Sequence, residues 1–119
     1  MKILLIFFIT FLTTYTNSNT LKCDEGGSTV KIAQCFSDEL IEQEKVLDAV
    51  LKQASKNNAR IFQKIQESHN IWLNYRKKHC SAIYASYDTG SMRLIAHPSC
   101  MLDMTRQRIQ TIQDSFLTY

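Results

Sequence analysis

The most informative segment of the chain reads Trp72-Leu73-Asn74-Tyr75-Arg76-Lys77-Lys78-His79-Cys80. Trp72, Arg76 and Cys80 recur at intervals of four residues, so on an α-helix they lie on one face. The preceding turns of that face carry Ile61, Phe62, Ile65 and His69. Because a buried charge without a partner is costly, Arg76 must either extend to the surface or meet an acidic side chain. The segment predicts a long helix that turns Trp72, Arg76 and Cys80 towards the core.

A second helical pattern precedes this segment. Its apolar face has an acid in the middle and consists of Leu40, Glu44, Leu47, Leu51 and Ala54. Either Ser28 or Ser37 can cap the start of this first helix, which should end near Ser55. Residues 56–58, Lys-Asn-Asn, favour a tight turn, and the next helix should run from about residue 58 to 83 or a little beyond. Two long helices joined so closely are expected to lie antiparallel, with Cys35 beside Cys80 at one end.

The C-terminal part of the chain predicts one more helix. Residues 86–91 break the periodicity and indicate a loop. The last helix should start around Pro98, because the missing N–H of proline is tolerated in a first turn. Its apolar face consists of Leu102, Thr105, Ile109, Ile112 and Phe116. We expect an all-α fold, a small disulfide-stapled bundle of three main helices with a short irregular or helical segment before the last.

The N-terminus has the pattern of a secretory signal peptide. Lys2 is followed by a short apolar run and then by small polar residues, which predicts a leader of residues 1–18 and a single domain of residues 19–119. An uncleaved anchor is the alternative, but the apolar run is about half of the ~20 residues that span a bilayer. Loss of Lys2 changes the net charge from +3 to +2. We expect a periplasmic or secreted protein that binds no nucleic acid and is not inserted in a membrane after cleavage.

The chain contains four cysteines, Cys23, Cys35, Cys80 and Cys100. An even number of cysteines in an oxidising compartment predicts two disulfides. A metal site is the alternative, since His79-Cys80 and His97-Pro98-Ser99-Cys100 could converge, but zinc ligand pairs usually have other spacings. We therefore expect neither a metal nor a cofactor.

The spacing Trp72-x2-Tyr75-Arg76-x3-Cys80, then Gly90-Ser91, then Cys100-x4-Thr105-x2-Arg108, resembles the signature of the LprI-like lysozyme-inhibitor domain family of exported bacterial proteins. The resemblance extends from Cys23 to about Ile112. The chain departs from the family pattern where Glu44 stands for Asp, Leu47-Asp48 for Leu-Asn, Leu51 for Tyr, His69 for Gln and Thr89-Gly90-Ser91 for Gly-Gly-Ser.

The resemblance implies a binding function. The expected partner is a lysozyme or another cell-wall-degrading enzyme, which the protein would inhibit. The alternative is an immunity or accessory protein that neutralises a toxin delivered into the periplasm. No nucleophile, base or carboxylate pair stands in a recognisable catalytic motif, and His69 on an apolar face is more typical of a core histidine, so we expect that the protein is not an enzyme.

Five residues are expected to have structural roles: Trp72, Arg76, Glu44, Thr105 and Arg108. Glu44 keeps an acid on the inward face of the first helix, so we expect Glu44 or Asp48 to pair with Arg76. The alternative is that Arg76 extends to the surface and is solvated. Trp72 is assigned to the core and not to a ligand site.

Disulfides are expected to join Cys23 to Cys35 and Cys80 to Cys100, while Cys35–Cys80 with Cys23–Cys100 stays open. The favoured pairing would close the irregular segment Tyr84–Arg93 into a loop, and binding residues concentrate on loops held by rigid scaffolds. The candidate partner-binding residues are Tyr84, Tyr87, Asp88, Ser91 and Arg93. Alternatively, the two tyrosines only cover the core while Gly90-Ser91 forms the turn.

Overall fold

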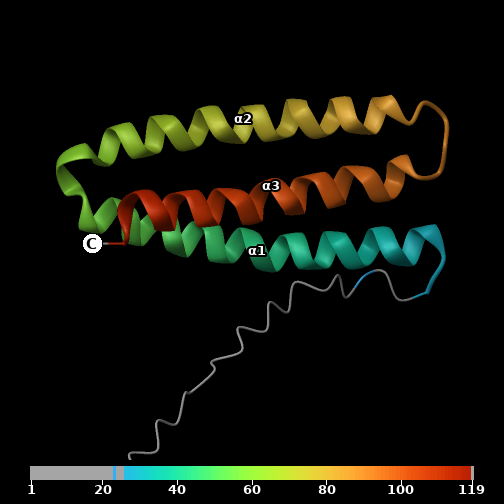
Figure 1. The fold of residues 1–119 in the computed structure, drawn as a ribbon, viewed down its shortest axis with the longest axis horizontal. Helices are drawn as coiled ribbons and strands as arrows, with labels where there is room; N and C mark the ends of the chain where they lie inside the picture. The colour runs from blue at the N-terminus through green and yellow to red at the C-terminus, as the bar shows by residue number, and fades with distance from the viewer. Residues whose placement is uncertain (1–22, 24–25, 119) are drawn as a thin grey trace, which may run out of the picture.

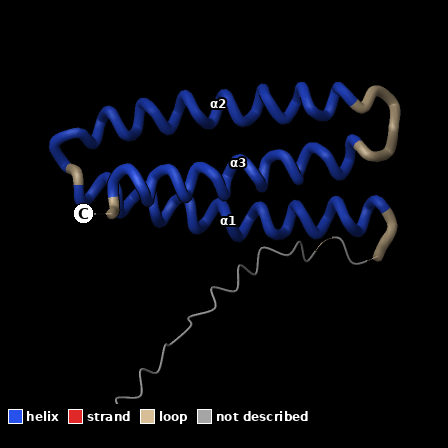
Figure 2. The backbone as a smooth tube through the Cα atoms, viewed as in Figure 1, coloured by secondary structure: helices blue, strands red, loops and turns tan. Residues whose placement is uncertain are grey.

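The structure describes residues 23 and 26–118. Three long helices account for most of this part of the chain. The computed structural model contains α1 (Thr29–Asn57), the short 3-10 helix η1 (Ala59–Ile61), α2 (Phe62–Ser86) and α3 (Arg93–Phe116), as Figure 1 shows. Figure 2 shows no strand in the described part, so the predicted all-α fold is confirmed. The predicted signal peptide, residues 1–18, lies outside the described residues. Within residues 23 and 26–118, no helix is both long and apolar enough to span a membrane.

Helix α3 supplies the main packing surface of the bundle. It packs along both α1 and α2, and in Figure 1 it runs between them. The helices α1 and α2 are antiparallel, as expected, but they make few direct contacts with each other. Cys35 and Cys80 lie towards the same end of the bundle, as expected, but α1 packs mainly against α3 and not against α2. Periodicity shows which face of a helix is apolar but does not show which helix covers it.

The core consists of two clusters along α3. The larger cluster contains Leu47, Val50, Leu51, Ala54, Ile65, Ile109 and Ile112. The smaller cluster contains Cys23, Phe36 and Leu102. Fully burying a side chain such as Leu102 or Ile112 stabilises the fold by about 1.5–3 kcal/mol. The predicted apolar faces of α1 and α3 are thus confirmed.

Phe62 departs from the predicted inward face of α2. Its side chain is 47% exposed, whereas Ile65, one turn later, is 2% exposed. The junction between α1 and α2 leaves a pocket at this point, and Phe62 lines that pocket and does not enter the core. The first turn of α2 therefore presents an aromatic ring to solvent.

Helix α3 starts earlier than predicted, at Arg93, so Pro98 lies inside the helix and not at its first turn. Proline has no N–H to donate to the carbonyl of Leu94, which disfavours this position. Two features compensate: Ile95 packs against the smaller cluster, and the backbone N–H groups of Ile95 and Ala96 donate to Met92 O. Packing of Ile95 and these two hydrogen bonds support the turn that precedes the proline.

Both ends of α1 have capping interactions. Ser28, one of the two predicted caps, accepts a hydrogen bond from the Lys31 backbone N–H at 3.4 Å. At the other end, Asn58 Nδ2 donates to Ala54 O at 2.9 Å and to Phe116 O at 3.2 Å. Asn58 thereby connects the end of α1 to the end of α3.

Candidate functional site

Arg76 lies at the centre of a polar network that connects all three helices. Its Nη2 atom lies 2.9 Å from Glu44 Oε1, and its Nη1 atom donates to Thr105 Oγ1 at 2.7 Å. The Thr105 hydroxyl in turn donates to Met101 O at 2.7 Å. The Arg76 side chain is 9% exposed and that of Glu44 is 42% exposed. The expected ion pair is therefore present with Glu44, and Arg76 does not extend into solvent.

Two guanidinium groups lie near the indole ring of Trp72. The Cζ atom of Arg76 is 4.9 Å from the centroid of the indole ring, and that of Arg108 is 5.7 Å away. Arg108 also donates from Nη2 to Ser68 Oγ at 3.2 Å. Trp72 is half-buried against the larger cluster, and the His69 ring stacks on it at a centroid distance of 5.6 Å. The surroundings of Trp72 fit a scaffold role.

His69 is a buried histidine whose Nδ1 atom has no hydrogen-bond partner in the described part of the chain. Burial is the main cause that lowers its pKa below the usual 6.5, and the positive charges of Arg108 and Arg76 act in the same direction. The carboxylate of Asp48 opposes them. Burial also lowers the pKa of Arg108. His69 is therefore neutral at neutral pH, as a packed core histidine should be.

A second ion pair connects α1 and α3. Arg106 Nη2 lies 2.7 Å from Glu39 Oε2, and both side chains are partly buried. Sequence reasoning did not find this pair, because its members are far apart in the chain and the register of α1 against α3 cannot be read from periodicity. A carboxylate oxygen of Glu39 also lies close to the sulfurs of Cys23 and Cys35, at distances at which three such atoms could coordinate one metal ion. Both sulfurs belong to a disulfide, so they are not available as thiolate ligands.

The disulfides join Cys23 to Cys35 and Cys80 to Cys100, which confirms the favoured pairing. Both lie towards the end of the bundle where α1 begins, α2 ends and α3 begins (Figure 1). The bond between Cys80 and Cys100 closes a separation of 20 residues that includes the connection from α2 to α3. This connection is therefore fixed at its base.

Residues 87–92 form the connection, which is shorter than the predicted irregular segment. Asp88 has a φ of 50°, in the left-handed region that Asp and Asn tolerate better than most residues. Gly90 donates from its N–H to Tyr87 O at 3.0 Å, and a Cβ atom at Gly90 would lie 3.2 Å from that oxygen. Arg93 Nη1 donates to Asp88 O at 2.9 Å, and its Cζ atom lies 5.2 Å from the centroid of the Tyr84 ring. These contacts connect the loop to the ends of α2 and α3.

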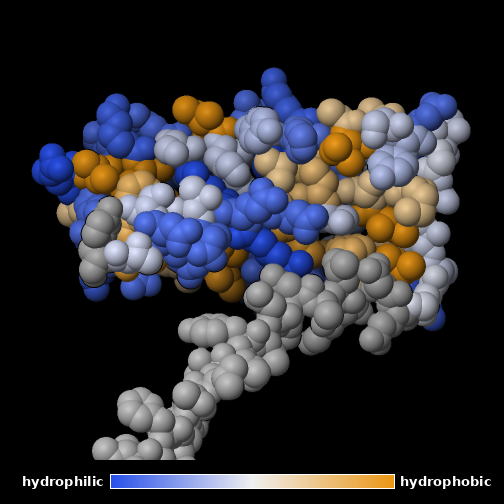
Figure 3. Space-filling model, viewed as in Figure 1, coloured by the Kyte–Doolittle hydropathy of each residue, from blue (hydrophilic) through white to orange (hydrophobic). Residues whose placement is uncertain are grey.

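The candidate binding residues fall into two groups. Tyr87, Asp88 and Ser91 are exposed, whereas Tyr84 and Arg93 are half-buried and contact each other. Two further exposed apolar residues were not predicted: Met92 (52% exposed), the last residue of the loop, and Leu94 (45%), in the first turn of α3. Figure 3 shows apolar side chains near this end of the bundle and mainly hydrophilic ones in the middle of the face. The exposed loop thus combines aromatic, apolar and acidic side chains.

A pocket between α2 and α3 continues the loop surface. It is lined by Tyr75, His79, Ile83, Tyr87, Ala96, Ser99, Cys100, Asp103, Met104 and Gln107. Tyr87 belongs to both the pocket and the loop. We call the exposed residues of the loop, Tyr87, Asp88, Ser91 and Met92, together with this pocket the loop face. Its surface is concave, partly polar and rigidly supported, which suits the binding of a protein segment.

Comparison with known families gives one match that covers most of the chain. The model of the family described as "Lysozyme inhibitor LprI" matches residues 22–112. The match contains the Arg76 network, both disulfides and the loop face. Comparisons with curated proteins and with solved structures find no match. The chain belongs to the LprI family of lysozyme inhibitors.

Proposed function

We propose that this protein inhibits a lysozyme or another cell-wall-degrading enzyme by binding it through the loop face. The observation that carries the proposal is the family match over residues 22–112, because the family is one of lysozyme inhibitors. Inhibition of this kind is a binding function and requires no catalytic group in the inhibitor.

The geometry of the loop supports this choice of surface. Tyrosine is among the residues that most often dominate the energy of protein interfaces, and Tyr87 is 45% exposed. The hydrogen bond from Arg93 to Asp88 O and the disulfide from Cys80 to Cys100 order the loop before a partner arrives. A loop that is already ordered loses less conformational entropy on binding. Tyr84 and Arg93 would support binding mainly by holding the loop.

We also propose that the protein acts after export, in the periplasm or outside the cell. Residues 1–18 have the composition of a signal peptide. Two disulfides in a domain of this size are typical of proteins that fold in an oxidising compartment. An exported inhibitor would meet its target at the cell wall.

Lysis of peptidoglycan suspensions by purified muramidases tests the proposed function. The exported protein is titrated against a panel of animal and bacterial muramidases, and it is also incubated with the suspension alone. We expect saturable inhibition of at least one muramidase and no lysis by the protein alone. Lysis by the protein itself, or full activity of every muramidase at saturating protein, would contradict the proposal.

A further inference from the structure

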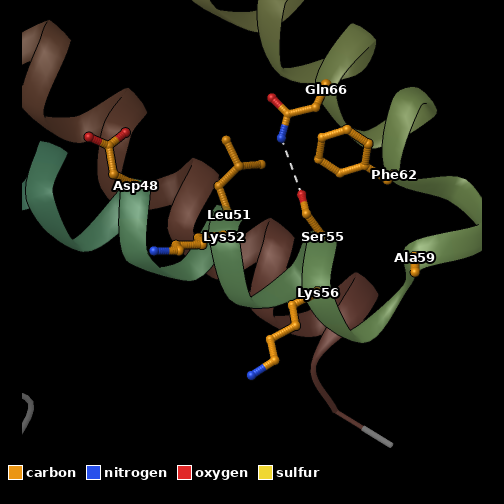
Figure 4. A pocket seen from close by; sticks show the side chains of 8 residues that line it. All are labelled: Asp48, Leu51, Lys52, Ser55, Lys56, Ala59, Phe62 and Gln66. Carbon is orange, nitrogen blue, oxygen red and sulfur yellow. Dashed lines mark hydrogen bonds between the residues drawn. The ribbon is translucent and has the colours of Figure 1, made fainter.

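The end of the bundle opposite the loop face carries a second pocket, which the proposed function does not use. It opens between the C-terminal part of α1 and the first turns of α2 and is lined by Asp48, Leu51, Lys52, Ser55, Lys56, Ala59, Phe62 and Gln66. Figure 4 shows Phe62 and Gln66 on the α2 side, and Lys52 and Lys56 on the α1 side. The helices α1 and α2 make few direct contacts with each other, and the pocket lies between them beside the chain reversal.

The floor and one wall of this pocket are apolar. Leu51 belongs to the larger core cluster, and Phe62, which is 47% exposed, lines the pocket on the α2 side. Gln66 Nε2 donates to Ser55 Oγ at 3.2 Å, as Figure 4 shows, and this hydrogen bond connects the first part of α2 to the last part of α1. Isolated exposed apolar residues are common, but an exposed aromatic ring at the edge of a supported pocket offers a binding site for another apolar side chain.

The rim of the pocket is positively charged. Lys52 and Lys56 are exposed on α1, and neither forms an ion pair with a described residue. Arg60, in the adjoining η1, is also exposed. Asp48 is the one carboxylate in the lining; it lies at the far end of the pocket from Ala59 in Figure 4, and its charge acts on His69. In Figure 4 the side chains of Lys52 and Lys56 extend from α1 away from Phe62, so their ammonium groups lie at the edge of the pocket.

We infer that this pocket binds an acidic amphipathic segment of a protein partner. One apolar side chain of the segment, of the size of leucine or phenylalanine, would pack against the exposed ring of Phe62. Carboxylates beside it would pair with Lys52 and Lys56, because the charges of the rim and the segment are complementary. The pocket gives the protein a docking site separate from the loop face, and the inference does not depend on muramidase inhibition.

Peptide titration followed by NMR tests the inference. The probe is a capped hexapeptide with two leucines between pairs of glutamates, and the control probe has lysines in place of the glutamates. We expect saturable shifts of the Leu51, Ala59 and Phe62 amide signals of the exported protein with the glutamate peptide. Its dissociation constant should be about tenfold lower than that of the lysine peptide, since two exposed ion pairs together amount to roughly a factor of ten.

Two variants separate the charged rim from the apolar floor. The double variant Lys52→Glu/Lys56→Glu should weaken binding of the glutamate peptide. The control Lys77→Glu/Lys78→Glu changes the net charge by the same amount at exposed positions of α2, away from the pocket, and should not weaken it. Phe62→Ser should weaken both peptides, while Ile71→Ser, at a position that is 72% exposed, should affect neither.

Four results would overturn the inference: equal affinity for the two peptides, equal effects of the two lysine double variants, shifts centred elsewhere on the bundle, or no shifts at all. Analytical ultracentrifugation tests whether the protein self-associates through this pocket. If the protein self-associates and Lys52→Glu/Lys56→Glu makes it monomeric, the occupant is a second copy of this chain and the inference of an acidic partner segment is wrong.

Discussion

Substitution of Glu44 by Gln tests the polar network most sharply, because the two members of the ion pair are buried to different extents. Arg76 is 9% exposed and Glu44 is 42% exposed, with 2.9 Å between the paired atoms. Removing one member of a fully buried pair costs about 3–5 kcal/mol, whereas exposed pairs contribute about 0.2–1 kcal/mol. Glu44→Gln leaves Arg76 with Thr105 and a neutral acceptor, so we expect it to lower the free energy of unfolding by about 1–2 kcal/mol.

The cost of Glu44→Gln should depend on Arg76. In an Arg76→Met background the buried charge at position 76 is removed, and water at the surface can solvate the original carboxylate of Glu44 or the substituted amide equally well. The Glu44→Gln substitution should then change the free energy of unfolding by less than about 0.5 kcal/mol. The coupling between the two positions should therefore be about 1–2 kcal/mol.

Urea unfolding of the four proteins with both disulfides intact measures this coupling. Glu42→Gln is the matched control, because Glu42 pairs with Lys45 at 2.7 Å but its side chain is 68% exposed. We expect this control to cost less than about 0.5 kcal/mol. Equal costs of Glu44→Gln in the wild-type and Arg76→Met backgrounds would refute the reasoning.

The remaining predictions concern the scaffold around the network. Trp72→Ala should lower the free energy of unfolding by about 3 kcal/mol, near the lower end for a tryptophan because Trp72 is half-buried, and an unchanged melting temperature would show that it is not part of the core. Burial lowers the pKa of His69, so as the pH falls below about 6.5 the unfolded chain takes up a proton before the folded protein does, and stability is lost. The variant His69→Gln should therefore show a smaller decrease in melting temperature between about pH 7.5 and pH 5 than the wild-type protein. An equal decrease in the variant would exclude His69 as its source. Replacing Cys80 and Cys100 together by Ser should lower the free energy of unfolding by about 3 kcal/mol, as expected for a closed separation of 20 residues, and peptide mapping that finds free thiols at these positions in the wild-type protein would contradict the assigned disulfide.

The sequence predicted the helices well because their apolar residues recur at helical spacing. Leu47, Leu51, Ile109 and Ile112 are all buried where their spacing placed them. It did not predict that α3 packs against both other helices, since an apolar stripe does not identify its partner. Pro98 favours a helix start, whereas the helix begins five residues earlier, where Ile95 packs against the smaller cluster and the N–H groups of Ile95 and Ala96 donate to Met92 O.

The candidate site could be predicted in part. The ion pair of Arg76 could be predicted because Arg76 lies on an apolar face, where a buried guanidinium without an acidic partner is costly. The position of Arg108 over Trp72 and the pair of Glu39 with Arg106 depend on the register between helices, which no local pattern encodes. Phe62 was expected inside because it lies near the inward face of α2, but the pocket at the chain reversal leaves it exposed.

The inhibition constant of a loop variant tests the central claim most directly. A muramidase that the wild-type protein inhibits is titrated with Tyr87→Ala/Met92→Ala, which removes two exposed side chains of the loop face, and with the control Val46→Ala/Ile71→Ala, which removes two exposed apolar side chains of α1 and α2. We predict that the loop variant raises the inhibition constant about a hundredfold and that the control leaves it unchanged, since residues at the centre of an interface contribute most of its energy. Unchanged inhibition by the loop variant, or an equal loss in the control, would contradict the claim that the loop face binds the enzyme.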